Sequence, residues 1–242
     1  MKRFSFLLLL VVSLSAQAQQ NLFNVPSGDM TSRKELFYQH QLNFYSASSW
    51  ESKVHLVYGL GKKWDAGVNF VDLPLDWSGG LQFSKNDQYK PYYPALMATA
   101  QKQWQLSKRS ELNIGTQAGS NVPAGSGRNQ FLFWNYSGVR YHLKHGFIIG
   151  GVYQTNANYV GEANSYVGYW LGFQIDMSER WQLMGDLTSG SHKKSGSTLG
   201  IVYNLSNRVQ LCGAGLLGFP NSNNKNGFVF EINVFTYDYK GS

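Results

Sequence analysis

The chain is poor in charge, in cysteine and in long apolar runs, and each shortage excludes a class of protein. Charged residues make up 14% of the 242 residues and aromatic residues 15%, a balance that argues against intrinsic disorder. The single cysteine, Cys212, excludes an internal disulfide and a cysteine-rich metal site. The apolar run from Phe6 to Val12 is too short for a membrane-spanning helix, which needs about 20 residues. A multi-span helical membrane protein is therefore excluded.

The first 18 residues have the three parts of a secretory signal peptide. Lys2-Arg3 precedes the apolar stretch 4–14, and Ala16-Gln17-Ala18 matches a cleavage site with small residues. We expect residues 1–18 to be removed near Ala18. Export argues against nucleic acid as a partner, despite a formal net charge of +7.

Alternation of apolar and polar positions, which is typical of half-buried strands, recurs through the rest of the chain. The clearest case is 167–177, where every second residue is apolar. The predicted strands have lengths that suit tilted strands crossing a bilayer. They are 34–45, 53–60, 64–72, 93–105, 111–119, 129–142, 147–158, 166–177, 181–188, 197–205, 208–217 and 227–239.

The connections between these segments alternate between short and long. The short connections are 61–63, 106–109, 143–146, 177–180 and 205–208, and the long ones are 46–52, 73–92, 120–128, 159–165, 189–196 and 218–226. Outer-membrane barrels have short periplasmic turns and long extracellular loops. The sequence therefore predicts an all-β protein, in which 34–242 form a 12-stranded antiparallel transmembrane β-barrel with up-and-down topology. We expect it in the outer membrane of a Gram-negative bacterium, with 19–33 as an N-terminal segment in the periplasm.

Aromatic residues gather near both kinds of connection, as in the interfacial girdles of a membrane barrel. The expected membrane-interface residues beside the short turns are Trp64, Trp104, Tyr141, Phe147 and Trp181. Those near the long loops are Phe70, Tyr93, Phe131, Phe133, Tyr159, Tyr166 and Phe228. The alternative is a soluble sandwich with an aromatic core. The signal peptide, the alternating connections and the two bands together favour the membrane barrel.

Several short stretches resemble one family of outer-membrane proteins. They are Asn24-Val25-Pro26-Ser27-Gly28-Asp29-Met30, Tyr58-Gly59-Leu60-Gly61, Trp64-Asp65-Ala66-Gly67-Val68-Asn69 and the Leu-Ser-x-Arg turns at 106–109 and 205–208. In these short motifs the mature chain resembles the outer-membrane proteins grouped under the MetA pathway of phenol degradation. The resemblance implies a transporter-like barrel that passes small hydrophobic or aromatic compounds.

The polar phase of the strands supplies the expected lining of the barrel interior. The pore-lining candidates are Gln39, Gln41, Asn43, Asn69, Asn113, Gln117, Gln130, Trp134, Arg140, Trp170, Gln174, Asp176, Asp186, Asn204, Glu231 and Asn233. A lining of amides with few charges differs from the charged rings of an ion-selective pore. It suits a neutral, partly apolar solute. A plugged, non-conducting interior, in which these groups hydrogen-bond each other, is the alternative.

Chemistry-bearing motifs are scarce. The sequence has no phosphate-binding loop, zinc-protease motif or serine-hydrolase elbow, and we expect no cofactor and no metal. His40 falls in the lipid-facing phase, where a lipid-modifying enzyme would need a serine within reach. The in-phase neighbours Val54, Leu56 and Ile232 offer none. We therefore expect that the chain is not an enzyme.

These observations predict a porin-like passive channel or transporter for a small neutral or hydrophobic solute. A structural barrel whose outer loops bind a partner is the second hypothesis, and a lipid-modifying enzyme the third. The expected partners are outer-membrane lipid, an unidentified small solute and lipopolysaccharide, whose phosphates suit cationic loops. The cations concerned are Lys85, Lys90, Arg128, Lys193, Lys194 and Lys225.

Overall fold

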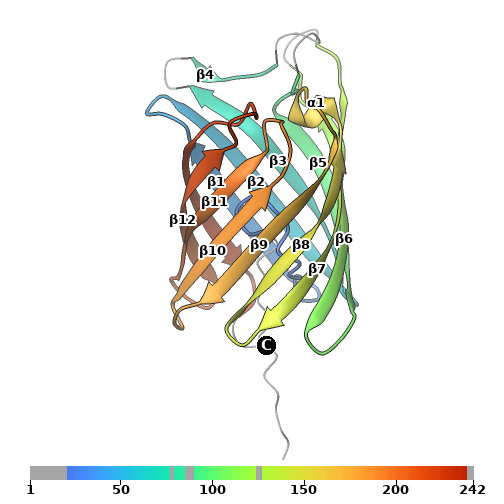
Figure 1. The fold of residues 1–242 in the computed structure, drawn as a ribbon, viewed down its shortest axis with the longest axis vertical. Helices are drawn as coiled ribbons and strands as arrows, with labels where there is room; N and C mark the ends of the chain where they lie inside the picture. Colours follow the sequence, from blue (N-terminus) through green and yellow to red (C-terminus); the bar gives the residue numbers. More distant parts are fainter. Residues whose placement is uncertain (1–20, 77–78, 85–89, 124–126, 239–242) are drawn as a thin grey trace, which may run out of the picture.

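In the computed structural model, residues 21–76, 79–84, 90–123 and 127–238 are described, and within them the chain forms a closed antiparallel barrel of twelve long strands (Figure 1). Each strand pairs with its neighbours in sequence, and β1 pairs with both β2 and β13, which closes the sheet. Closure is required in lipid, because an open edge would leave backbone groups without partners. The predicted signal peptide, 1–18, lies outside the described residues.

The strands follow the predicted order. They are β1 (Leu36–Phe44), β2 (Ser49–Gly61), β3 (Trp64–Asp76), β5 (Ala95–Gln105), β6 (Ser110–Asn121), β7 (Phe131–Leu143), β8 (Gly146–Thr155), β9 (Val167–Asp176), β10 (Trp181–Thr188), β11 (Gly196–Asn204), β12 (Val209–Gly218) and β13 (Gly227–Phe235). Two short elements lie in the long loops, β4 (Gly80–Leu81) and α1 (Ala157–Val160). No helix among the described residues is long and apolar enough to cross a membrane.

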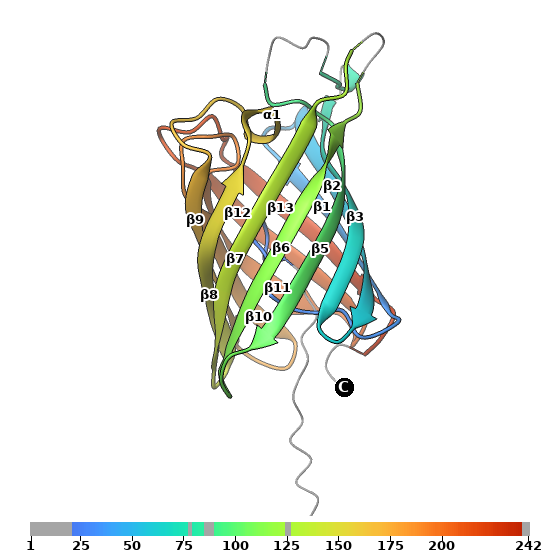
Figure 2. The ribbon, with the colours of Figure 1, turned by 90° about the vertical axis from the view of Figure 1, so that its right-hand side faces the viewer.

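Short turns lie at one end of the barrel and the longer loops, with α1 and β4, lie at the other (Figures 1 and 2). The predicted 12-stranded barrel is thus confirmed, with shifts at a few strand ends. The segment predicted as 147–158 stops at Thr155, because the Asn156 side chain accepts a hydrogen bond from the Tyr159 amide and begins α1. The strand predicted as 64–72 continues to Asp76, beyond an irregularity at Asp72, where φ is 56°.

The strands separate an apolar outer face from a mostly polar inner face. In β9 the outward positions Val167, Leu171 and Ile175 are 60%, 51% and 40% exposed, whereas Trp170 and Gln174 are buried. Because the outside of such a barrel meets lipid rather than water, exposed apolar side chains are the favourable arrangement there. The predicted phase of this strand therefore agrees with the structure.

Four of the five aromatic residues expected beside the short turns lie on the outer face. Trp64, Trp104, Tyr141 and Trp181 are all exposed. The expectation for Phe147 is wrong, since its ring is buried inside and lies under the Arg140 guanidinium, whose carbon is 4.4 Å from the ring centroid. The distance of a residue from a turn indicates its depth in the membrane. Its position in the alternation of the strand decides whether its side chain faces the lipid or the lumen. Tyr159, expected near the outer rim, is likewise buried, in α1.

Substituting Arg for Leu171 tests the assignment of the faces. Leu171 lies near the middle of β9 on the lipid side, so a guanidinium there should cost about 2–4 kcal/mol of unfolding free energy. Met177, which is exposed in the turn after β9, is the depth control, and Met177→Arg should cost about 0–1 kcal/mol. Denaturant unfolding of both variants in lipid vesicles measures the difference. Equal stability of the two variants would show that the faces are inverted.

Candidate functional site

Residues 21–33, here called the N-terminal segment, lie inside the barrel, enclosed by the strands (Figure 1). This position differs from the periplasmic one expected for 19–33. Leu22, Phe23 and Val25 are buried in the same apolar cluster as side chains of the barrel wall. The lumen is therefore filled in part by the chain itself, and not by wall side chains alone.

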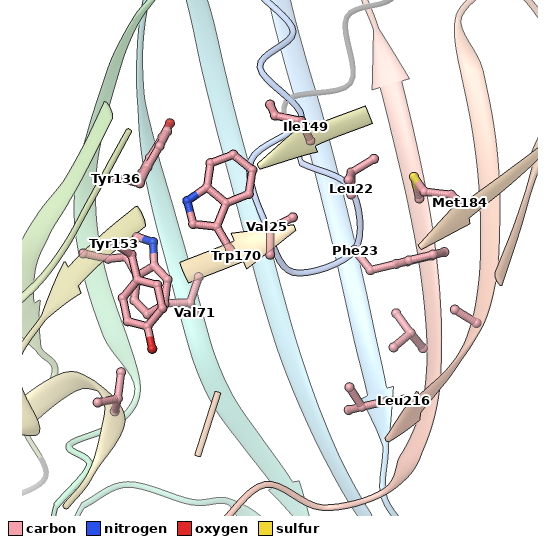
Figure 3. Packing of buried hydrophobic residues seen from close by; sticks show 14 of the residues in the cluster. Leu22, Phe23, Val25, Val71, Tyr136, Ile149, Tyr153, Trp170, Met184 and Leu216 are labelled. Atoms are coloured by element: carbon pink, nitrogen blue, oxygen red, sulfur yellow. The ribbon is translucent and has the colours of Figure 1, made fainter. Parts of the chain in front are cut away.

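A tight turn forms the tip of the segment. The Leu22 amide donates to the Val25 carbonyl at 2.9 Å, and Asn21 pairs with Pro26. Figure 3 shows Leu22 and Val25 among Ile149, Trp170 and Met184 of the wall.

Gly172 is the wall position that admits this tip. A Cβ added there would lie 2.1 Å from Leu22 Cδ1, so the missing side chain makes room for leucine. Phase alone gives Gly172 an inward position, but the sequence gives no sign of what occupies the space beside it.

Below the tip the segment is held by polar bonds. Arg140 donates to the Asp29 carboxylate and, at 3.3 Å, to the Ser27 carbonyl. Gln101 and Gln103 donate to the carbonyls of Asp29 and Gly28 at 2.9 and 2.7 Å. Glu111 completes the cluster, because its carboxylate lies 3.5 Å from Arg140 Nε and 2.9 Å from His142 Nε2.

Asn24 ties the tip to the opposite wall. Its backbone amide donates to the Asp186 carboxylate, and its side-chain amide donates to Thr198 Oγ1 at 2.8 Å. Its side-chain oxygen accepts from Gln41 and from Lys53, each at 3.3 Å. The segment thus contacts the wall on both sides of the lumen.

Acids and amides of β12 and β13 form a further stretch of polar wall. Asn233 donates to Glu231 at 2.9 Å and faces Gln210 and the thiol of Cys212 at 3.4 and 3.6 Å. All four side chains are buried. Several buried polar atoms in this interior have no protein partner, including an oxygen of Glu231 and both amide atoms of Asn113. Buried polar groups of this kind are normally satisfied by water.

A cavity lies between the tip of the segment and the long loops. The cavity has a volume of about 80 Å³, which is room for several water molecules. The lining combines amides, aromatic rings and charged groups, among them Asn24, Gln41, Asn43, Glu51, Lys53, His55, Gln117, Trp134, Tyr159, Asp186, Lys193 and Lys194.

The charges around the cavity are largely compensated. Lys194 lies in the loop between β10 and β11. Its Nζ donates to both carboxylate oxygens of Asp72 in β3, each at 2.7 Å. Glu51 of β2 lies between Lys53, at 3.6 Å, and Lys193, at 3.4 Å. Lys193 and Lys194 therefore pair with lumenal acids, and lipopolysaccharide as a partner of the loop cations stays a prediction.

His192 anchors this loop in the barrel mouth. Its ring is buried, with Nε2 2.8 Å from the Tyr153 hydroxyl, which itself donates to the Ser189 carbonyl at 2.6 Å. Nδ1 accepts from the Lys194 amide at 3.2 Å, so the bonds fit a neutral ring protonated at Nε2. Burial, and secondarily the Lys194 charge, lower the pKa of His192 from 6.5 to about 4.

The side chains predicted to line the lumen lie mostly on the inner face. The buried ones are Gln39, Gln41, Asn43, Asn69, Asn113, Trp134, Arg140, Trp170, Gln174, Asp186, Asn204, Glu231 and Asn233. Gln117 is half-buried beside the cavity, Asp176 is half-buried and accepts from Gln182, and Gln130 precedes β7 at the rim. Only some of them border the cavity, because the N-terminal segment covers others. Their role in lining a pore stays a prediction.

Glu51, Lys53 and Asp72 were not predicted as lumenal residues. The strand predicted from 53 begins at Ser49, which places Glu51, Lys53 and His55 in one inward phase of β2. That alternation is visible in the sequence. Asp72 could not be found by phase, since the irregularity in β3 buries both Val71 and Asp72.

On the outer face, β1 and β2 bring together a histidine and a serine. His40 Nε2 lies 2.9 Å from Ser52 Oγ. The sequence predicts a loop over 46–52 and a strand from 53, so Ser52 does not fall among the predicted in-phase neighbours of His40.

Comparisons with known proteins give only distant structural likenesses. No family model and no curated protein matches the sequence, so the resemblance to the phenol-degradation family stays a prediction. Outer membrane phospholipase A from Escherichia coli is 12% identical, with 93% of this chain and 96% of that chain covered and a TM-score of 0.47. The toluene transporter TbuX of Ralstonia pickettii is 6% identical, with 85% and 89% covered and a TM-score of 0.48. Salmonella typhi OmpF is 4% identical, with 83% and 96% covered and a TM-score of 0.40.

These likenesses concern the barrel fold, which is that of outer-membrane proteins, and they do not settle what this chain binds. They do include an enzyme. The prediction that the chain is not an enzyme is overturned at its premise, because it assumed that no serine lies within reach of His40, whereas Ser52 Oγ lies 2.9 Å from His40 Nε2.

Trp170→Ala tests how the tip is held. The indole is fully buried, donates to the Val152 carbonyl at 3.3 Å and lies edge-on to Tyr136. Its removal leaves a cavity beside the segment, so we expect a loss of about 3–5 kcal/mol of unfolding free energy. Trp181→Ala, at an exposed ring on the outer face, is the control and should cost clearly less. Equal losses in denaturant unfolding would contradict a buried role for Trp170.

Acidification tests the His192 anchor. The folded-state pKa of about 4 lies below the ordinary 6.5, so the ring stays neutral in the fold while the opened loop takes up a proton. The stability that the anchor contributes is present above pH 6.5 and is lost as the pH falls from about 6.5 toward 4. Hydrogen exchange of loop 189–195 should therefore accelerate between pH 7 and pH 5, after correction for intrinsic rates. His192→Gln should abolish that pH dependence, and an unchanged dependence would assign it to another group.

Proposed function

We propose that the barrel passes a small neutral or hydrophobic solute across the outer membrane, with the N-terminal segment as a movable plug. The observation that carries the proposal is the position of the segment. It fills part of the lumen directly beneath a cavity that lies toward the long-loop end.

The way the segment is held supports movement. Besides the apolar contacts of its tip, the segment is attached by hydrogen bonds and one ion pair, and the wall behind it carries polar groups such as Gln101, Gln103 and Arg140. Water can solvate these polar groups when the segment leaves, which lowers the cost of breaking the polar contacts. The amide atoms of Asn113 are buried without a protein partner, which indicates that the hydrogen bonding between the segment and the wall is incomplete.

The chemistry of the cavity supports the class of solute. Its lysines are paired with Glu51 and Asp72, which leaves little net field to select an ion. The rings of Phe23, Trp134 and Tyr159 border the same space as the amides. Apolar walls with a few placed polar groups suit a small, largely uncharged molecule.

A reversible tether tests the plug. With Cys212→Ala as background, Leu22→Cys and Gly172→Cys place two thiols where the leucine now fills the glycine position. We expect the oxidised protein in liposomes to admit neutral solutes no faster than protein-free liposomes, and reduction to restore swelling. The reduced form of the same protein is the control for folding.

Two results would contradict parts of this proposal. Equal swelling of oxidised and reduced protein, at the rate of the untethered background, would show that the segment need not move. Absence of swelling and of planar-bilayer conductance, both in the wild type and after deletion of 21–31, would indicate a non-conducting barrel. That result would favour the alternative of a structural barrel whose outer loops bind a partner.

A further inference from the structure

The hydrogen-bonded pair His40–Ser52 lies on the outer face of the barrel and does not border the lumenal cavity. His40 alternates with the inward Gln39 and Gln41 along β1 and therefore projects outward, beside Leu42. A titratable side chain facing hydrocarbon is rare and costly, and in membrane proteins it is by default a sign of function.

Strand register fixes the pair. His40 is opposite Val54 and Leu42 is opposite Ser52, so the histidine and serine meet on a diagonal between β1 and β2. Nε2 and Oγ are 2.9 Å apart, a distance at which imidazole can take the hydroxyl proton. An irregularity in the pairing of β2 with β3 falls between Ser52 and Val54, and such irregularities re-aim side chains.

Ser52 lies at a depth where a lipid ester can reach it. Two residues before it, Trp50 packs edge-on against Phe44 with ring centroids 5.1 Å apart, and aromatic pairs of this kind mark the headgroup level. Two residues along a tilted strand correspond to about 5 Å of depth. Ser52 therefore sits just inside the aromatic level at the long-loop end, where acyl chains join their headgroups.

We propose that Ser52 and His40 cleave the carboxylic ester of a membrane-lipid acyl chain. Ser52 Oγ attacks the ester carbonyl while His40 Nε2 takes its proton. The carbon–oxygen bond to the alcohol then breaks, and the alcohol leaves with that proton. Water, deprotonated by His40, attacks the acyl-serine, which releases the fatty acid and returns the proton to Ser52.

The surroundings of the pair suit this substrate. Ser52 is only 8% exposed, and its neighbours on the outer face include Leu42, Val54 and Leu73. An acyl chain can lie along these side chains with its carbonyl at the hydroxyl, whereas a water-soluble ester gains little from them.

The experiment uses the folded full chain in vesicles of phosphatidylethanolamine and phosphatidylglycerol, with and without lipopolysaccharide. A fluorophosphonate probe reports the reactive serine by mass spectrometry, and released fatty acid reports turnover. The variants are Ser52→Ala and His40→Ala, with Ser137→Ala as the matched control. Ser137, which is half-buried in β7, also lies on the outer face and is paired with the exposed Ile114 and Val152.

We expect an adduct on Ser52, its loss in Ser52→Ala, and a fall in turnover of about 10²- to 10⁴-fold in His40→Ala. Ser137→Ala should match the wild type. Release of ordinary acyl chains identifies phospholipid as the substrate, and release only in the presence of lipopolysaccharide identifies the latter.

Absence of an adduct on Ser52 together with absence of fatty acid from both vesicles, in wild type that is folded by gel mobility, would overturn the proposal. Turnover that persists in Ser52→Ala would overturn it as well, and would leave the pair a structural one. Liposome swelling measured on the same samples is independent of these results, so failure here does not bear on the plug.

Discussion

In lipid every backbone N–H and C=O must find a partner, and the rest of this structure depends on that constraint. It forces the sheet to close through β1, β2 and β13, and closure gives each strand one face toward lipid and one toward a shared interior. Barrels of about 8 strands are filled by side chains, and those of 16 to 18 remain open. Twelve strands lie between these sizes, and here the N-terminal segment of the chain occupies part of the interior.

The alternation of residue types predicted the barrel, its strand order and most inward positions, because period-two patterning reports the face directly. The prediction failed at positions where something other than the period-two alternation decides which way the side chain points. Phe147 was assigned by its distance from a turn, which carries no information on phase, and Asp72 turns inward at an irregularity that breaks the period. The sequence predicts a strand from 53, whereas β2 begins at Ser49, so Ser52 lies in the strand and not in the predicted loop. Boundary errors of this size change which side chains can meet, as His40 and Ser52 do.

The N-terminal segment could not be predicted, since no periodic pattern connects it to its site. Leu22, Phe23 and Val25 are an apolar group in a short stretch without strand signal, and their receiving surface is assembled from residues far apart in sequence, including Gly172. Only the fold brings these parts together. The same holds for the ion pair between Asp29 and Arg140, whose members are more than a hundred residues apart.

The position of the single cysteine gives the lumen a native chemical label. Cys212 is buried on the inner wall, beside Glu231 and Asn233 and opposite Val202 of β11. A thiol there meets water only through the interior of the barrel, since the outer face of β12 is turned to lipid. The rate at which a small water-soluble alkylating agent marks the unaltered protein in intact cells therefore measures how often the interior admits a molecule of that size, without any engineered residue or current recording.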